Sequence, residues 1–291
     1  MTTPAVVARQ GRLPTLLEAI KFEHTIFALP FAYLGMVLAA HGWPGWSPFI
    51  WISVAMVAAR TLAMAANRVI DRHLDAANPR TAQRAVPQGL LSSAELTALA
   101  VVALAVFVLA AAQLNELVLK LAPLAVIVLV GYSYTKRFTW LTHFILGFAD
   151  GMAPVGAWLA VTGHLSWGAL LLGLAVTAWI GGFDVIYACQ DVDFDHRYRL
   201  YSIPSQFGIA TGLWVARLVH VATAVLLLAV GLVAGLGLGY FVGWLLAVAL
   251  LVYEHRLVTP HDLSRLNVAF FNVNGYIAVI VFVFAVLGLY V

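Results

Sequence analysis

The stretch from Leu213 to Tyr253 indicates the fold class most directly and reads LWVARLVHVATAVLLLAVGLVAGLGLGYFVGWLLAVALLVY. A bilayer core is roughly 30 Å thick and needs about 20 apolar residues per helical crossing, so this stretch is about twice as long as one crossing requires. Gly235, Leu236 and Gly237 interrupt it near the middle, and glycines favour a turn. We therefore interpret the stretch as two membrane-spanning helices joined by a tight turn, with one long kinked segment as the alternative.

The rest of the chain has the same apolar character. Of its 291 residues, 63% are hydrophobic and only 10% are charged, and the mean hydropathy is +0.95. Soluble domains contain about 25% charged residues, so a soluble globular protein is excluded. Further apolar runs lie at about residues 22–40, 49–70, 96–112, 117–134, 141–161, 167–187 and 268–291. The sequence predicts an all-α, polytopic integral membrane protein with nine transmembrane helices and a single domain over residues 1–291.

The distribution of charge predicts how the helices are oriented. Lys and Arg residues precede the first run and occupy the loops after every second run, whereas the opposite loops contain almost none, Lys120 being the exception. Because positive loops stay cytoplasmic, we expect a cytoplasmic N-terminus and an external C-terminus in a bacterial inner membrane. The scattered basic residues form no stripe for nucleic acid, and the single Cys189 cannot form an internal disulfide. No cleavage pattern precedes the first run, which we expect to be retained.

One acidic cluster follows the second predicted helix and reads NRVIDRHLD from Asn67 to Asp75. Spacing by four places Asn67, Asp71 and Asp75 on successive turns of one helix face, if the helix continues to Asp75. Such acids lie at a helix C-terminus, where the helix dipole disfavours negative charge by roughly 0.3–1 kcal/mol. We therefore expect a cation to compensate them.

A second acidic cluster follows the sixth predicted helix and reads DVIYACQDVDFD from Asp184 to Asp195. On a helix, Asp184, Asp191 and Asp195 share a face, and Asp193 points elsewhere. Clusters of carboxylates suit a hard cation such as Mg²⁺, which binds one or two carboxylates together with waters and substrate phosphates. Two facing clusters would hold a diphosphate through metal ions, while nearby basic side chains neutralise its remaining charge.

The two clusters are similar to the signatures of the UbiA family of intramembrane prenyltransferases. The first resembles the family's NxxxDxxxD motif and its RxxxR-type loop at Asn67, Asp71, Leu74, Asp75, Arg80, Thr81, Arg84 and Gly89, and the second resembles its YxxxDxxxD motif at Tyr187, Asp191 and Asp195. Asn78 stands where the family usually has an apolar residue, and we expect it to alter loop packing and not metal binding. The segments KFEHTIFALP (21–30) and NVAFFNVNG (267–275) resemble the 4-hydroxybenzoate polyprenyltransferase-like branch, including members of futalosine-route menaquinone synthesis.

The resemblance implies a reaction and its substrates. It implies Mg²⁺-dependent transfer of a polyprenyl chain from its allylic diphosphate to an aromatic acid, 4-hydroxybenzoate or a hydroxynaphthoate, in ubiquinone or menaquinone biosynthesis. The helices would surround a central cavity capped by the loops at about 71–93 and 190–212, with no obligatory protein partner. Alternatives are a prenyltransferase for a haem, chlorophyll or lipid precursor and, in another class, a cation-coupled secondary transporter. Transporters tend to place their acids near the bilayer midplane.

The resemblance, together with the chemistry of the charged residues, indicates the candidate site residues. The Mg²⁺ ligands would be Asn67, Asp71, Asp75, Asp191 and Asp195, of which Asp71 and Asp191 are the most critical for catalysis. The diphosphate oxygens would be contacted by Arg72, Arg80, Arg84 and Lys136. Within the spans, Arg60 would hold the acceptor carboxylate and Asp184 or Tyr187 would orient the aromatic ring, unless the charged residues form a structural pair; the role of Asp150 is open. The histidines near the predicted cytoplasmic surface, His73, His143 and His196, are expected to be solvated.

Overall fold

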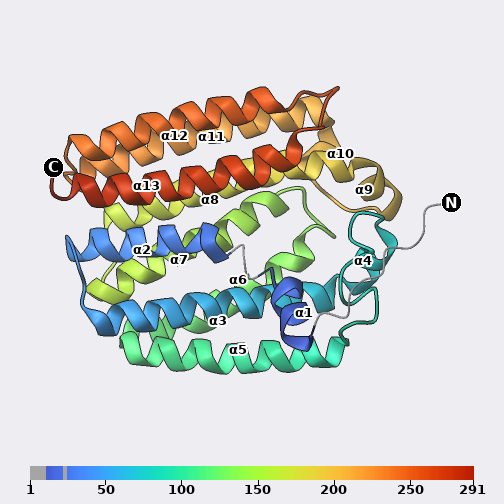
Figure 1. Cartoon of the computed structure of the whole chain (residues 1–291), viewed down its shortest axis with the longest axis horizontal. Helices are drawn as coiled ribbons and strands as arrows, with labels where there is room; N and C mark the ends of the chain where they lie inside the picture. The colour runs from blue at the N-terminus through green and yellow to red at the C-terminus, as the bar shows by residue number, and fades with distance from the viewer. Residues whose placement is uncertain (1–10, 22–24) are drawn as a thin grey trace.

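The computed structural model describes residues 11–21 and 25–291, without the side chains of residues 25–28. The chain forms a bundle of long helices that run roughly side by side (Figure 1). The long helices are α2 (Thr25–Ala40), α3 (Trp46–Ile70), α5 (Ser93–Leu114), α6 (Glu116–Thr135), α7 (Thr142–Thr162), α8 (Trp167–Ala188), α11 (Ile209–Val233), α12 (Leu238–Leu257) and α13 (Asn274–Gly288). The short elements are α1 (Arg12–Ala19), α4 (Arg72–Ala77), the 3-10 helix η2 (Cys189–Asp191), α9 (Val192–Tyr198), α10 (Ile203–Phe207) and the π-helix η3 (Val268–Val273).

The predicted helices are confirmed. Eight helical segments in the described part of the chain are long and apolar enough to cross a membrane, and the apolar part of α2, Leu29–Ala40, adds a shorter one. The start of the first predicted run, at Phe22, lies outside the described residues, as does Arg9. The predicted tight turn is also present, because α11 ends at Val233 and Gly235 takes a left-handed φ of 62° before α12 begins.

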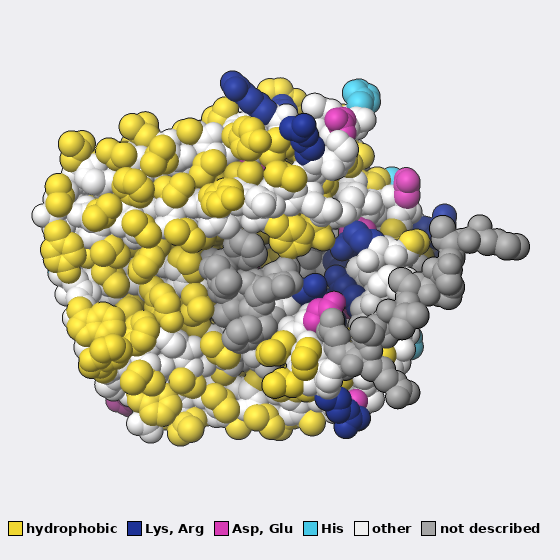
Figure 2. All heavy atoms as spheres, in the orientation of Figure 1, with side chains coloured by type: hydrophobic (Ala, Val, Ile, Leu, Met, Phe, Trp, Pro, Cys, Tyr) yellow, Lys and Arg dark blue, Asp and Glu magenta, His cyan; other side chains and the backbone are white. Residues whose placement is uncertain are grey.

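Charged side chains gather at one end of the bundle. The short helices α4, α9 and α10 lie together at that end (Figure 1), and most Lys, Arg, Asp and Glu side chains of the visible face lie there as well (Figure 2). Hydrophobic side chains are spread over much of the rest of the visible face (Figure 2), as expected for a surface that contacts lipid. The two acidic clusters therefore lie at the polar end and not at the middle of the bundle.

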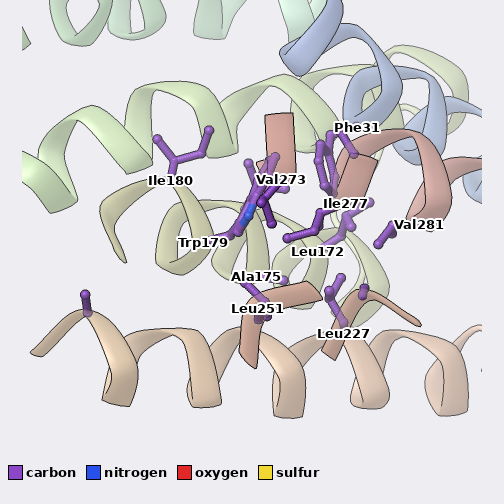
Figure 3. Close-up of a cluster of buried hydrophobic side chains, with 14 of the residues drawn as sticks. Phe31, Leu172, Ala175, Trp179, Ile180, Leu227, Leu251, Val273, Ile277 and Val281 are labelled. Atoms are coloured by element: carbon purple, nitrogen blue, oxygen red, sulfur yellow. The ribbon is translucent and has the colours of Figure 1, made fainter. Parts of the chain in front are cut away.

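Helix α8 is the centre of the largest buried cluster. Trp179, which is 1% exposed, packs among residues of α2, α11, α12 and α13 such as Phe31, Leu227 and Ile277 (Figure 3). The Trp179 indole donates a hydrogen bond to Asn274 Oδ1 at 2.8 Å, so its polar atom is satisfied inside the apolar core. This packing fixes α8, the helix that leads into the second acidic cluster.

Helices α7 and α8 approach each other closely through small residues. A Cβ atom added at Gly147 would collide with the Thr177 carbonyl oxygen, and one at Gly151 with the Thr177 hydroxyl oxygen. Close approach through glycines is a common way to pack membrane helices, where dispersion contacts replace the hydrophobic driving force. The approach brings His143 on α7 next to Asp184 on α8, and Asp150 on α7 lines the same cavity as Asp184.

Candidate active site

The two acidic clusters line one cavity at the polar end of the bundle. The cavity has a volume of about 640 Å³ and is lined by α3, α4, α6, α7, α8, α9 and the π-helix η3. Of the candidate site residues, the structure brings together Arg60, Asn67, Asp71, Asp75, Arg80, Arg84, Lys136, Asp184, Tyr187, Asp191 and Asp195. Arg72 is not brought into the cavity, because it is exposed and donates a hydrogen bond to the Val69 carbonyl oxygen at 3.0 Å.

The first cluster keeps its predicted spacing of one residue per helical turn, although α3 ends before Asp71 and a separate helix, α4, follows it. Helix α3 ends at Ile70, and Asp71 has φ −94° and ψ 4° before α4 begins. The Asp71 amide still bonds the Asn67 carbonyl oxygen at 2.9 Å, and the Asp75 amide bonds the Asp71 carbonyl oxygen at 2.8 Å. These bonds preserve the four-residue spacing across the break, so all three side chains reach the same cavity.

Asp71 is buried among donors at the end of α6. Lys136 Nζ lies 2.7 Å from Asp71 Oδ2, and Arg137 Nη2 lies 2.8 Å from Oδ1. The Asn67 side-chain amide also donates to Oδ2 at 2.9 Å. Because Asp71 is only 2% exposed, these charge-assisted bonds are what make its burial possible.

Asp75 is held by two arginines on its protein side. Arg84 Nη1 donates to Oδ1 at 2.6 Å, and Arg68 Nη1 lies 3.9 Å from Oδ2. Arg68 is itself buried and donates to the Ala19 carbonyl oxygen at 2.9 Å, which ties α1 to α3. Asp75 Oδ2 is buried and accepts no hydrogen bond in the described part of the chain. One carboxylate oxygen thus remains available to a further cation.

The second cluster departs from its predicted geometry. Helix α8 ends at Ala188, and the chain passes through η2 into α9, so Asp184, Asp191 and Asp195 do not share one face of a continuous α-helix. Asp191 and Asp195 nevertheless both line the cavity, and the exposed Asp193 does not. Ser202 Oγ donates to Asp195 Oδ2 at 2.8 Å, which joins this cluster to the start of α10.

Arg80 and Asn78 connect the two clusters. Arg80 reaches Asp191 with two donors, Nε at 3.0 Å and Nη2 at 2.6 Å, and reaches the Tyr187 hydroxyl with Nη1 at 3.2 Å. Burial acts to lower the pKa of Arg80, but its hydrogen bond and charge interaction with Asp191 outweigh burial and raise that pKa above its ordinary value. The buried Asn78 amide donates to Asp191 Oδ1 at 3.0 Å. Asn78 therefore contacts a candidate metal ligand, a contact that the expectation of an effect on loop packing did not include.

His143 also corrects an expectation. Its side chain is 2% exposed instead of solvated, and its Nδ1 lies 2.6 Å from Asp184 Oδ2. His73 and His196 are exposed, as expected. Sequence reasoning had also missed Arg68 and Arg137 as partners of the first cluster; their proximity to Asp71 and Asp75 depends on how α3, α6 and the following loop pack.

A second, mostly apolar cavity adjoins the first. It has a volume of about 370 Å³ and extends between α3, α5, α6, α7 and α8. Both cavities share the lining residues Arg60, Met64, Tyr132, Leu146 and Asp150. At this junction Arg60 Nη1 lies 3.8 Å from Asp150 Oδ1, and Arg60 Nε is buried with no hydrogen-bond partner in the described part of the chain.

The residues of the site fit a magnesium ion. The candidate ligands are all oxygen donors on one cavity, and Asp75 Oδ2 is a buried oxygen with no donor. Among the described residues, no three His, Cys, Asp or Glu side chains lie close enough together to enclose a metal alone. This arrangement agrees with Mg²⁺, which is bound by one or two carboxylates and completed by waters and substrate phosphates.

Comparisons with known proteins agree with this geometry. The model of the UbiA prenyltransferase family matches residues 28–288. The 4-hydroxybenzoate octaprenyltransferase of Edwardsiella ictaluri is 33% identical over 88% of this chain and 89% of its own length. That of Vibrio campbellii is 30% identical over 84% of this chain and 86% of its own length.

Solved structures show the same fold. A UbiA homologue from Aeropyrum pernix superposes with a TM-score of 0.83 at 33% identity and covers 91% of this chain and 98% of its own. A UbiA homologue from Archaeoglobus fulgidus, solved with DMAPP and Mg²⁺, has a TM-score of 0.68 at 18% identity and covers 92% of this chain and 99% of its own. The transporter alternative is set aside, because the matched family consists of prenyltransferases. The chain belongs to the UbiA prenyltransferase family and is a prenyltransferase enzyme of the membrane.

Proposed function

We propose that the protein transfers a polyprenyl chain from its allylic diphosphate to an aromatic acid, 4-hydroxybenzoate or a hydroxynaphthoate, in a Mg²⁺-dependent step of quinone biosynthesis. The observation that carries this proposal is the single cavity in which both acidic clusters and their basic partners meet, next to an apolar cavity. The names of the relatives, 4-hydroxybenzoate octaprenyltransferases, support the choice of acceptor. A prenyltransferase acting on a haem, chlorophyll or lipid precursor is the alternative.

The ion pairs of the cavity suggest how the donor binds. Mg²⁺ ions held by Asn67, Asp71 and Asp75 of the first cluster and by Asp191 and Asp195 of the second, together with waters and diphosphate oxygens, would supply positive charge that stabilises the departing diphosphate. Arg80, Arg84 and Lys136 each pair with one of these carboxylates. If these carboxylates hold Mg²⁺, the same basic side chains would be available to bind diphosphate oxygens. The site therefore exchanges internal ion pairs for pairs with the donor, and no buried charge is left uncompensated.

The apolar cavity suits the polyprenyl tail. It begins where the polar cavity ends and is lined mainly by aliphatic side chains and Phe107 and Phe148. A tail in this cavity would place the allylic carbon at the junction, away from water that would quench a developing carbocation. Tyr187 and Phe270, whose ring centroids lie 4.0 Å apart, add an aromatic wall to the polar cavity.

Arg60 is positioned to bind the carboxylate of the acceptor. Its Nη1 lies 3.8 Å from Asp150 Oδ1, beyond hydrogen-bond distance, and its buried Nε has no acceptor in the described part of the chain. A guanidinium with unused donors inside a membrane favours a planar carboxylate, with which it forms two parallel hydrogen bonds. This contact would select aromatic acids over acceptors that lack a carboxylate.

A panel of acceptors tests the proposed function. Purified protein with Mg²⁺ and a polyprenyl diphosphate should convert 4-hydroxybenzoate or a hydroxynaphthoate to a prenylated product, detected by mass spectrometry together with released diphosphate. Asp71→Asn and Asp191→Asn should lower turnover by about 100-fold or more, because each removes a carboxylate that would hold the Mg²⁺ which stabilises the leaving group. The exposed Asp193→Asn is the matched control. A panel in which only acceptors without a carboxylate react would overturn the assignment.

Metal removal is a separate test. EDTA should abolish turnover and added Mg²⁺ should restore it, since Mg²⁺ supplies charge that no described side chain replaces. Asp75→Asn should raise the Mg²⁺ concentration that gives half-maximal rate. Turnover that persists in EDTA would contradict the metal assignment and leave prenyl transfer itself to be judged by the acceptor panel.

A further inference from the structure

His143 and Asp184 form a hydrogen-bonded pair at the side of the cavity. His143 lies in the first turn of α7, and Asp184 lies near the end of α8. Their atoms Nδ1 and Oδ2 are 2.6 Å apart, and the His143 side chain is 2% exposed. On its other side, His143 Nε2 lies 3.2 Å from the backbone nitrogen of Ile203.

The Ile203 amide determines which histidine nitrogen carries the proton. A backbone N–H can only donate, so His143 Nε2 is the acceptor of that bond and carries no hydrogen. The proton of the neutral ring therefore sits on Nδ1 and is donated to Asp184 Oδ2. Ile203 is the first residue of α10, where an N–H has no partner inside its own helix, so this bond also satisfies the helix start.

Asp184 and Asp195 differ from the other aspartates of the cavity, because no ion pair with Arg or Lys reaches either of them in the described part of the chain; Asp195 is buried and accepts a hydrogen bond from Ser202 Oγ. Asp71, Asp75, Asp150 and Asp191 each lie within 4.0 Å of an Arg or Lys nitrogen. Asp184 has only the neutral histidine donor, and no hydrogen bond from the described residues reaches its Oδ1. Its side chain is 23% exposed, and it lines the cavity. One oxygen of the Asp184 carboxylate therefore faces the cavity without a donor from the described residues.

We propose that Asp184 is the general base of the reaction and that His143 is the residue that positions it. This inference rests on the proposed function. The bond between the allylic carbon and the diphosphate oxygen breaks with its electron pair on the diphosphate, and a ring carbon of the acceptor forms the new bond to the allylic carbon. The C–H bond at that ring carbon then breaks, its electron pair restores the aromatic ring, and the proton moves to Asp184 Oδ1. The proton later leaves to water at the cavity mouth.

The base is connected to the second acidic cluster through α10. Ser202 caps α10 by accepting a hydrogen bond from the Ser205 amide at 3.2 Å, and the Ser202 hydroxyl donates to Asp195 Oδ2 at 2.8 Å. The next residue, Ile203, donates to His143. One turn of chain thus positions both the candidate metal ligand Asp195 and the base Asp184.

A kinetic isotope effect tests the role of Asp184. In the wild-type enzyme, proton loss follows a slower bond-forming step, so an acceptor deuterated at the reacting ring carbon should give an isotope effect on kcat close to 1. In Asp184→Asn, proton loss becomes slow: kcat should fall by about 100-fold or more and the isotope effect should exceed about 2. Asn has the shape of Asp and still accepts a hydrogen bond from His143. Asp193→Asn, on the exposed side of α9, should match the wild type.

The role of His143 is tested by a pair of variants. His143→Phe removes the donor to Asp184, so kcat should fall by about tenfold and the isotope effect should appear, with little change in the KM of the donor. His143→Asn places an amide N–H near the position of Nδ1 and should recover part of kcat. Equal losses in both variants without an isotope effect would mean that His143 only supports the fold.

Three outcomes separate this inference from the proposed function. Asp184→Asn with kcat within threefold of wild type would overturn it. A slow Asp184→Asn enzyme whose isotope effect stays at 1 would also overturn it, because proton loss would then not be the impaired step. Asp184→Glu keeps a carboxylate and should retain more of kcat than Asp184→Asn, which separates loss of the base from loss of the fold. A wild-type enzyme that prenylates no acceptor would instead overturn the proposed function.

Discussion

Arg80 connects the loop after α4 to the opposite wall of the cavity, where it contacts Asp191 and Tyr187. Its two bonds to Asp191 require the planar fork of a guanidinium, and its third donor reaches Tyr187. Because its pKa is raised above an already high ordinary value, Arg80 stays charged throughout the working pH range. Any pH dependence of activity should therefore come from other groups.

Replacing Arg80 by lysine tests whether the fork itself matters. Arg80→Lys keeps the charge but loses paired donation, so the KM of the prenyl diphosphate should rise by about tenfold while kcat changes less. Steady-state kinetics with varied donor measures both. Arg197→Lys, at an exposed position of α9, is the control. Unchanged KM in Arg80→Lys would show that only the point charge is needed.

The meeting of the two acidic clusters could be predicted, because the four-residue spacing of the first survives the break at Asp71, and because Asp191 and Asp195 of the second still line the cavity. Their partners could not. Arg137 and Lys136 are neighbours in sequence, yet only the packing of α6 against α3 shows that both contact Asp71. His143 looks like a residue near the surface until α7 and α8 are placed side by side. Contacts between helices depend on rotation and depth, which apolar runs in a single sequence do not specify.

At the level of elements, the close contact of α7 and α8 is the most restrictive. Gly151→Leu would force the helices apart, because a Cβ atom there collides with Thr177, and should cost about 1–3 kcal/mol or more. The measured result would be a lower Tm in detergent and a loss of activity, since α7 carries His143 and α8 carries Asp184. Gly156→Leu is a matched control on α7, because a Cβ atom at Gly156 meets nothing within 4 Å. Equal Tm values for the two variants would contradict the close approach.

Helix α12 is joined to α13 and α11 by a buried polar group. Glu254 is 0% exposed and accepts a hydrogen bond from Asn274 Nδ2 at 2.9 Å. Its other oxygen, Oε2, is buried without a donor in the described part of the chain and lies 3.6 Å from His220 Nδ1. Glu254→Gln supplies an N–H to that position and should keep or raise the Tm. Glu254→Leu removes one of three acceptors of Asn274 Nδ2, which also donates to the Ala269 and Phe270 carbonyl oxygens, and should cost about 1 kcal/mol. Thermal unfolding that ranks Leu above Gln would show that the hydrogen bonds are dispensable.

The existence of the helices was predictable from composition, whereas their irregular ends were not. Apolar runs identify α3 and α8, because a membrane requires every backbone group to be bonded within its own helix. The breaks at Asp71 and at η2 occur at the polar end, where side chains and loops satisfy the backbone instead. The π-helix η3 has no sequence signal in its run VAFFNV that distinguishes it from an α-helix.

For the whole molecule, the placement of basic loops predicts the side on which the chemistry occurs. In a Cys189→Ala background, Arg197→Cys should react with a membrane-impermeant thiol reagent only after cells are permeabilised. His164→Cys, in the exposed loop between α7 and α8, should react in intact cells. Labelling in the opposite pattern would reverse the predicted orientation without changing the site.

The gathering of the two acidic clusters and their basic partners at one end of the bundle has an electrical consequence. Moving one elementary charge across a membrane at 100 mV involves about 2.3 kcal/mol, so a device that shuttles ions between the two faces responds to voltage. Here a diphosphate would arrive and depart at the same end, while the tail in the apolar cavity is uncharged. In proteoliposomes, a potassium diffusion potential of about 100 mV of either sign should leave the rate unchanged within experimental error. The enzyme would be electrically silent and would work equally well in energised and in depolarised membranes.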